Sequence, residues 1–235
     1  MKNLHKFNTQ AECNSAKLKS PNICFVEETR GIFSNKTNDY VDLGLPSGTK
    51  WMKYNLGAEK ETDYGLYFQV GATVGYTDSD VKPHSYWSTL PGNSGAATGQ
   101  YLDLLNWNKA NTNNGVLNTS VDAAYANTNG AAKTPTVADI NELVDNTNIS
   151  WTTINGVTGR KFTNKKDSSK YIFIPASGYG YNSNPHSGGT TYIMSSSTYS
   201  NPKGWYFFSF SESSCSTISD WMDRPYAVCV RGIKV

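Results

Sequence analysis

Short runs of alternating apolar and polar residues recur along most of the chain, and turn residues separate them. Such period-two runs are typical of half-buried β-strands. Two of the runs flank Asn155 and Gly156. Because both central residues of a type I′ turn take positive φ, this dipeptide predicts a β-hairpin. The predicted strands cover residues 40–43, 49–51, 151–154, 157–162, 171–174, 191–194, 205–210 and 226–230.

Two segments show helical spacing instead. Residues 121–126 have one apolar face, and after a cap at Thr136, Ile140 and Leu143 fall at the i, i+3 spacing of a second helix. Residues 78–119 form a long stretch rich in Asn, Gly, Ser and Thr, which predicts a functional loop or a surface insertion. Many short strands, two short helices and long loops together predict an α+β fold.

Residues 1–38 differ from the rest of the chain. Thr9 and Glu12 have the spacing of a helix capping box, which predicts a short helix over residues 10–18, and residues 23–26 form a brief strand-like run. The segment has too few apolar residues for a core of its own. We therefore expect an N-terminal attachment arm over 1–38 and one domain over 39–235, with a polar linker over 34–38.

The composition narrows the classes of partner. With 21 basic and 19 acidic residues the formal net charge is +2, and no basic block is present that would neutralise a run of phosphates, so no nucleic-acid partner is expected. The sequence contains no run of about 18 apolar residues, and its start lacks the apolar core of a signal peptide. Neither membrane insertion nor conventional secretion is expected.

Signatures of catalysis are missing from the sequence. It has no GxSxG elbow, HExxH motif, glycine-rich phosphate loop or EF-hand spacing. His5, His84 and His186 lie far apart, and Asp78 and Asp80 lack a third ligand for a hard cation. We therefore expect a non-enzymatic protein without catalytic residues, metal or cofactor.

The four cysteines, Cys13, Cys24, Cys215 and Cys229, show neither a CxxC motif nor the spacing of zinc ligands. Free buried thiols are the favoured interpretation. A bridge between Cys215 and Cys229 stays open, since strands of one sheet could bring them together.

Aromatic residues make up 13% of the chain, and many stand beside Ser, Asn and Gly in its C-terminal half. Tyr and Trp give stiff contact area while Ser, Asn and Gly give adaptable hydrogen bonds, as in antibody paratopes, although most of the rings are expected in the core. Residues 220–224 form the densest polar and aromatic cluster, which suits either a ligand or an internal Asp–Arg pair beside a core Trp.

Side chains of the strand over 205–210 alternate between two faces, so one set is expected to enter the core. We expect residues 211–224 to form an exposed loop at the end of that strand. The candidate ligand-binding residues are Trp205, Glu212, Ser214, Asp220, Trp221, Asp223 and Arg224.

A series of motifs resembles, in order, a domain abundant in surface proteins of Bacteroidetes and Fibrobacter. The matching residues are 40–51 (its opening), 63–68 (its aromatic block), 133–136 (its Arg-Met-Pro-Thr step), 172–179 (its Leu-Pro-Ala-Ala-Gly-Tyr segment), 192–197 (its Tyr-Trp-Ser-Ser-Ser turn) and 230–233 (its closing Val-Arg-Pro-Val strand). That domain has a C-type-lectin-like fold related to the formylglycine-generating enzyme and occurs in variable proteins of diversity-generating retroelements. The resemblance implies this fold over residues 40–235.

The chain departs from the family pattern at several positions. Met194 replaces the usual Trp, and Val70 stands where Trp is common. Cys215 and Cys229 do not match the close cysteine pair that holds copper in the oxidase branch, and the calcium motif of sugar-binding C-type lectins is missing. The resemblance therefore implies neither oxidase activity nor calcium-dependent glycan binding.

The N-terminal arm resembles the start of structural proteins encoded by phages of gut Bacteroidales, including crAss-like phages. This resemblance implies a virion protein assembled in the host cytoplasm, which agrees with the missing signal peptide. The arm residues expected to attach the chain to other virion proteins are Leu4, Phe7, Ile23, Phe25 and Val26.

These expectations combine into one leading hypothesis. The chain is a non-enzymatic phage virion protein, a head or tail fibre or decoration subunit, that forms a homotrimer and presents a lectin-like face to a host cell-surface glycan or protein. Two alternatives stay open. One is a purely structural capsid or tail component without a ligand, and the other is an adhesin or copper-dependent oxidase-like enzyme on a bacterial cell surface.

Overall fold

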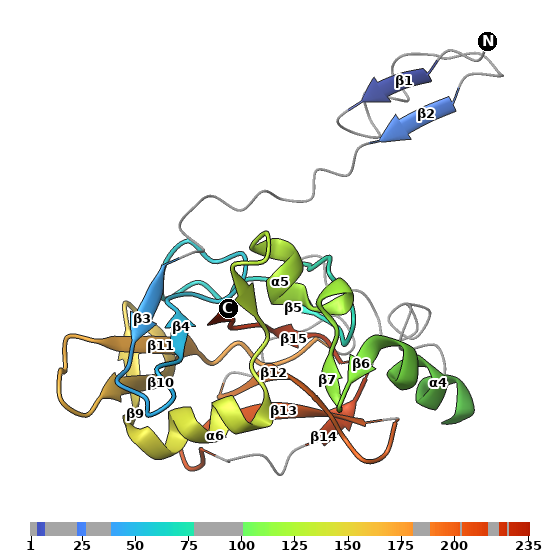
Figure 1. Ribbon diagram of the computed structural model, residues 1–235. Coiled ribbons are helices and arrows are strands. Elements are labelled where there is room, and N and C mark those ends of the chain that lie inside the picture. The colour runs from blue at the N-terminus through green and yellow to red at the C-terminus, as the bar shows by residue number, and fades with distance from the viewer. Residues whose placement is uncertain are drawn as a thin grey trace. The chain divides into compact units, whose positions relative to one another are not determined.

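The computed structural model describes residues 4–7, 23–26, 39–77, 101–180, 189–202, 204–215, 221–224 and 226–235 (Figure 1). The chain divides into two compact units, Met1–Ile32 (unit 1) and Phe33–Val235 (unit 2). Most of the described elements are short strands in sheets, accompanied by few helices. The protein is therefore α+β, as the sequence predicts.

Unit 1 contains a two-stranded parallel sheet of β1 (Leu4–Phe7) and β2 (Ile23–Val26), in which Leu4 pairs with Ile23 and Phe7 with Val26. The predicted strand over 23–26 is confirmed. A parallel pair needs a connection of a dozen or more residues, and residues 8–22 supply that length. The helix predicted over 10–18 and the linker predicted over 34–38 lie outside the described residues.

The largest sheet of unit 2 has seven strands. They are β5 (Tyr67–Phe68), β6 (Thr112–Asn113), β7 (Val116–Leu117), β12 (Thr190–Thr198), β13 (Gly204–Ser211), β14 (Trp221–Asp223) and β15 (Val228–Cys229). The main path runs β14-β13-β12-β15-β5, and β7 joins β6 to β12. Neighbours on this path are antiparallel except β12 and β15, which are parallel.

A second sheet has three antiparallel strands, β9 (Thr147–Ile154), β10 (Val157–Asn164) and β11 (Tyr171–Pro175). Between β9 and β10, Asn155 has φ 47° and Gly156 has φ 80°. These are the positive values that a type I′ turn requires, so the predicted hairpin is confirmed.

A four-stranded sheet joins the start of unit 2 to its end. It contains β3 (Tyr40–Asp42), β4 (Lys50–Met52), β8 (Ala132–Lys133) and β16 (Ile233–Lys234), in the order β3-β4-β16-β8. Ile233 pairs with both Trp51 and Lys133. The last strand of the chain, β16, therefore lies between β4 and β8, so the first and last strands of unit 2 belong to one sheet.

Among the described residues, unit 2 has the helices α4 (Tyr101–Asn111), α5 (Ala123–Asn127) and α6 (Val137–Asn146) and the 3-10 helix η3 (Thr119–Val121). The cap predicted at Thr136 is present, with the Thr136 and Asp139 side chains each accepting from the other's backbone N–H. In Figure 1, α6 and the β9–β11 sheet lie at one end of the unit and α4 at the other, with β12 and β13 between them.

The core consists of two apolar clusters that share β13. Phe208 and Phe210 pack with Ile140 and Leu143 of α6, whereas Trp205 and Phe207 pack with the other cluster, around Met194, Val70 and α5. The sequence predicted that one alternate set of β13 side chains enters the core, and the structure confirms it. The other set also contributes, because the two apolar clusters lie on opposite faces of the strand.

Two predicted loops contain regular structure. Residues 101–117, within the predicted loop over 78–119, form α4, β6 and β7, while residues 78–100 lie outside the described residues. Residues 221–223, within the predicted loop over 211–224, form β14, which completes the edge of the seven-stranded sheet. The described part of the chain is therefore more regular than its Asn- and Ser-rich composition indicates.

Candidate functional site

An exposed turn after β13 carries two of the predicted ligand-binding residues, Glu212 and Ser214. The backbone N–H of Ser211 donates to the carbonyl of Ser214 at 2.8 Å, and Phe210 forms an isolated bridge with Cys215. These bonds fold residues 211–215 back on themselves. The carboxylate of Glu212 and the hydroxyl of Ser214 therefore reach solvent from a short, closed turn.

The side chain of Arg160, on β10, is hydrogen-bonded to the backbone of this turn. Its Nη2 donates to the carbonyl oxygens of Ser211 and, at 3.1 Å, of Glu212. The guanidinium carbon lies 5.5 Å from the centroid of the Trp151 ring, and Trp151 makes an edge contact with Phe210 at 6.5 Å between centroids. Arg160 is itself largely buried, so two carbonyl groups of the turn are bonded to a donor whose position the fold sets.

A group of three half-buried tyrosines lies near the same end of the sheet. The ring of Tyr179 makes edge contacts with those of Tyr192 and Tyr226, both at 5.2 Å between centroids. Tyr192 pairs with Ser209, two residues before the turn, and Thr190 pairs with Ser211. We call Tyr179, Tyr192 and Tyr226 the tyrosine group. Tyr179 and Tyr192 pack against the apolar cluster that contains Trp205 and Phe207, so the tyrosine group is fixed close to the turn along the strands.

The remaining predicted residues are not all at this end of β13. Asp223 pairs with Gly204 and Trp221 with Tyr206, so β14 runs along β13 toward the end opposite the turn. At about 3.3 Å per residue, the two ends of β13 lie roughly 23 Å apart. Asp220 and the side chains of Trp221 and Asp223 lie outside what the structure describes. The predicted set is therefore divided along β13 and is not gathered in one loop.

Trp205 and Arg224, two of the predicted ligand-binding residues, are both 0% exposed, so neither side chain is open to a ligand. The guanidinium carbon of Arg224 lies 4.3 Å from the ring centroid of Trp107 and 5.0 Å from that of Trp205, and Nη1 donates to Asn108 Oδ1 at 2.9 Å. Burial lowers the pKa of Arg224 to about 9. These residues attach α4 to the sheet by cation–π stacking.

Cys215 and Cys229 are free thiols, so the bridge that the sequence left open is not formed. The Cys229 thiol is buried and donates to the carbonyl of Tyr64 at 3.2 Å. Burial raises the pKa of Cys215, which disfavours the reactive thiolate. Within the described part of the chain, no three His, Cys, Asp or Glu residues are grouped as they would be around a metal ion.

The predicted attachment residues Leu4, Phe7, Ile23, Phe25 and Val26 all belong to β1 and β2, which pair with one another.

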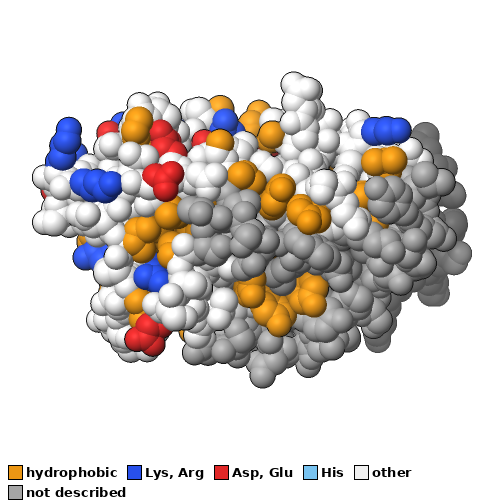
Figure 2. Space-filling view, turned by 90° about the horizontal axis from the view of Figure 1, so that it is seen from below, with side chains coloured by type: hydrophobic (Ala, Val, Ile, Leu, Met, Phe, Trp, Pro, Cys, Tyr) orange, Lys and Arg blue, Asp and Glu red, His pale blue; other side chains and the backbone are white. Residues whose placement is uncertain are grey.

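No helix in the described ranges combines the length and apolar character needed to span a membrane. Charged side chains visible in Figure 2 gather mainly at the end of unit 2 that carries β9–β11, and uncharged side chains cover most of the other described surface of that face.

Sequence reasoning missed Arg160 and the tyrosine group. The pairing of Tyr with Ser, Asn and Gly in the C-terminal half was the available signal for the tyrosines, but it does not say which rings come together. Arg160 had no signal, because its role depends on contacts with residues 51 and 52 positions away.

Comparisons with protein families, with curated proteins and with solved structures found no match to this chain. The function is therefore inferred from the residues and from their arrangement.

Proposed function

We propose that the chain is a non-enzymatic phage virion protein whose unit 2 has a C-type-lectin-like fold and binds a glycan or protein on the host cell surface. The observation that carries this proposal is the exposed turn with Glu212 and Ser214, supported by Arg160 and lying near the tyrosine group. The α+β architecture of unit 2 is compatible with the lectin-like fold that the ordered sequence motifs imply.

The chemistry of this surface suits recognition. A carboxylate accepts hydrogen bonds from hydroxyl or amide donors, and a serine hydroxyl both donates and accepts. Tyrosine rings offer apolar contact area at a small cost in conformational entropy. Because the turn is closed by its own backbone bonds and supported by Arg160, binding would require little further ordering.

Unit 1 supplies the second half of the proposal, attachment to the particle. Its described strands form only a two-stranded sheet, and such a sheet is marginally stable by itself in water. Packing against other virion proteins through Leu4, Phe7, Ile23, Phe25 and Val26 would stabilise it. A homotrimer on the virion would then present several weak sites together, and multivalency raises avidity by roughly two to four orders of magnitude.

The test is binding of the fluorescently labelled full chain to intact gut Bacteroidales cells. The variant is Glu212→Ala/Ser214→Ala, and the matched control is Glu59→Ala/Ser200→Ala, which removes the same two groups at exposed positions elsewhere. We expect the first variant to lose at least about tenfold in binding, since hydrogen bonds to charged groups contribute about 1.5–3 kcal/mol. The control should bind like the parent protein.

Two results would count against the proposal. One is equal binding by both variants, which would put recognition elsewhere on the chain. The other is no binding to any strain, even when the protein is clustered on beads, which would favour a purely structural virion component. Circular dichroism of each variant checks that the fold is retained.

A further inference from the structure

A cleft of about 530 Å³ opens on unit 2 away from the turn, between β3 and β11. Tyr40 lines it from β3, Tyr171 from β11, and Glu61 from the segment after β4. Its volume is within the range of roughly 300–1,000 Å³ that small-ligand sites occupy. The cleft is therefore large enough to hold a small organic ligand.

Both tyrosine rings in the cleft are held in place. The hydroxyl of Tyr40 donates to the carbonyl of Ala131 at 2.8 Å, and the Lys234 ammonium lies 5.9 Å from its ring centroid. The Lys161 ammonium lies 3.8 Å from the centroid of Tyr171. Burial first, and then a hydrogen bond to Glu61, raise the pKa of Tyr171. The two rings are thus fixed before any ligand arrives.

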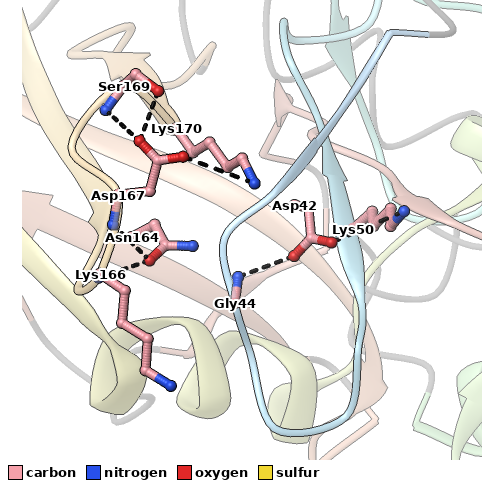
Figure 3. Close-up of polar contacts among 8 residues, drawn as sticks. All are labelled: Asp42, Gly44, Lys50, Asn164, Lys166, Asp167, Ser169 and Lys170. Carbon is pink, nitrogen blue, oxygen red and sulfur yellow. Dashed lines mark hydrogen bonds and ion pairs between the residues drawn. The ribbon is translucent and has the colours of Figure 1, made fainter.

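The polar side chains at the rim of the cleft are also fixed by local bonds. The carboxylate of Asp167 accepts from the hydroxyl of Ser169 at 2.6 Å and pairs with Lys170 at 3.7 Å. On the β3 side, Asp42 accepts from the N–H of Gly44 at 3.0 Å. Figure 3 shows Lys170 extending from its turn toward β3, where Asp42 lies. Donors and acceptors therefore face the cleft from two separate elements.

The balance of charge restricts the class of ligand. Three carboxylates, of Asp39, Asp42 and Glu61, line the cleft against the two ammonium groups of Lys53 and Lys170. Asp42 is paired with Lys50 and Lys170 with Asp167, and Lys161 and Lys234 lie against the two tyrosine rings. The charges around the cleft therefore nearly balance and give little attraction to a phosphate or a sulfate. A hydroxyl group needs both an acceptor and a donor, and carboxylates and ammonium groups provide both. An apolar ring face can lie on a tyrosine ring.

From these observations we propose that the cleft between β3 and β11 binds an uncharged oligosaccharide, with Glu61 and Lys170 bonding its hydroxyls and Tyr40 and Tyr171 contacting its ring faces. This site is separate from the turn after β13. The inference does not depend on the proposed role of the turn in host recognition.

The experiment screens the full chain against an array of neutral, carboxylated and sulfated oligosaccharides, followed by calorimetric titration with the strongest neutral binder. The test variant is Glu61→Gln/Lys170→Gln. The control is Glu59→Gln/Lys166→Gln, which makes the same two exchanges at nearby exposed positions that do not line the cleft. We expect neutral oligosaccharides to bind, the test variant to weaken binding about tenfold, and the control to keep the parent affinity.

The inference is overturned if no neutral oligosaccharide binds at millimolar concentration, if only carboxylated or sulfated ones bind, or if the test variant keeps the parent affinity. Cell binding by the Glu212→Ala/Ser214→Ala variant is measured in a separate experiment from the oligosaccharide titration. Failure of the cleft and failure of the turn are therefore distinguishable.

Discussion

The guanidinium of Arg231 is fully buried and connects three segments of unit 2. It donates to Asn55 Oδ1 at 2.8 Å, to the carbonyls of Met52 and Lys53 at 3.1 and 2.6 Å, and to the carbonyl of Phe173 at 2.8 Å. Burial lowers its pKa to about 9. These four neutral acceptors offset the cost of placing a charge in the core and hold β11 next to the end of β4.

Replacing this residue, in Arg231→Met, leaves three buried acceptors and one partly buried acceptor without their donor. We expect the free energy of unfolding to fall by about 3 kcal/mol or more, since each unpaired buried group costs about 1–3 kcal/mol. Urea denaturation followed by fluorescence measures the change, with Lys234→Met at an exposed position as the control. A loss below about 1 kcal/mol would mean that these bonds do not stabilise the fold.

Two glycines in the loop between β3 and β4 provide a matched comparison. Gly44 has φ +69°, and a Cβ there would lie 2.8 Å from Asn164 Nδ2, whereas Gly48 has φ +75° and nothing within 4 Å. Asn164 has little room to yield because its Oδ1 accepts from the backbone N–H of Lys166 and Asp167. Gly48→Ala should cost about 1–2 kcal/mol of backbone strain, and Gly44→Ala should cost more in the same thermal unfolding assay. Equal losses would show that the contact with Asn164 does not matter.

Acid should weaken the turn that holds Lys170. Hydrogen bonds from Ser169 hold the pKa of Asp167 below its usual 3.8. The folded state therefore binds fewer protons than the unfolded state near this pH, so the contribution of Asp167 to stability is present above pH 3.8 and is lost as the pH falls through its lowered pKa. Urea unfolding across this range should show a smaller decline for Asp167→Asn than for the parent chain. An identical decline would exclude Asp167 as a source of acid sensitivity.

Local chemistry was predictable at single residues, and long-range contacts were not. Asn155 and Thr136 act through neighbours within three positions, so their roles follow from the sequence. Arg160 and Arg231 act through partners that only the finished fold brings together. The burial of Trp205, which the sequence predicted as a candidate ligand-binding residue, likewise depends on α4, an element with no clear sequence signal.

At the scale of elements, α6 was predictable because its apolar residues keep helical spacing behind a capping box. Helix α4 was not, because its Asn, Asp and Lys residues are mixed with apolar ones without a clear apolar face. Contacts of Trp107 and Asn108 with Arg224 connect α4 to the strands of the large sheet. Strand β14 was not predictable because its three residues, Trp221–Asp223, are too few to show an alternating pattern.

The capping box of α6 gives a prediction at this scale. Thr136→Ala removes the hydroxyl that accepts from the N–H of Asp139. We expect a loss of about 1 kcal/mol in the free energy of unfolding, measured by urea denaturation. Thr153→Ala, in the β9–β10 hairpin, controls for the loss of a threonine hydroxyl elsewhere. A Thr136→Ala protein as stable as the parent chain would show that packing of Ile140 and Leu143 alone maintains the helix.

At the scale of the whole molecule, the chain combines a small unit with a larger one that contains both apolar clusters. The first and last strands of unit 2, β3 and β16, belong to the same four-stranded sheet. We therefore expect residues 33–235 to fold without unit 1. The sequence predicted the α+β class. It placed most of the candidate site in the loop over 211–224, because the course of β14 along β13 is visible only once the strands are paired.

Binding of residues 33–235 to intact gut Bacteroidales cells, compared with that of the full chain, tests the central claim most directly. If unit 2 recognises the host and unit 1 attaches to the particle, the shortened protein should keep its circular dichroism spectrum and bind cells with the affinity of the full chain, measured with both as monomers. A folded but non-binding fragment would contradict the claim, since recognition would then require unit 1.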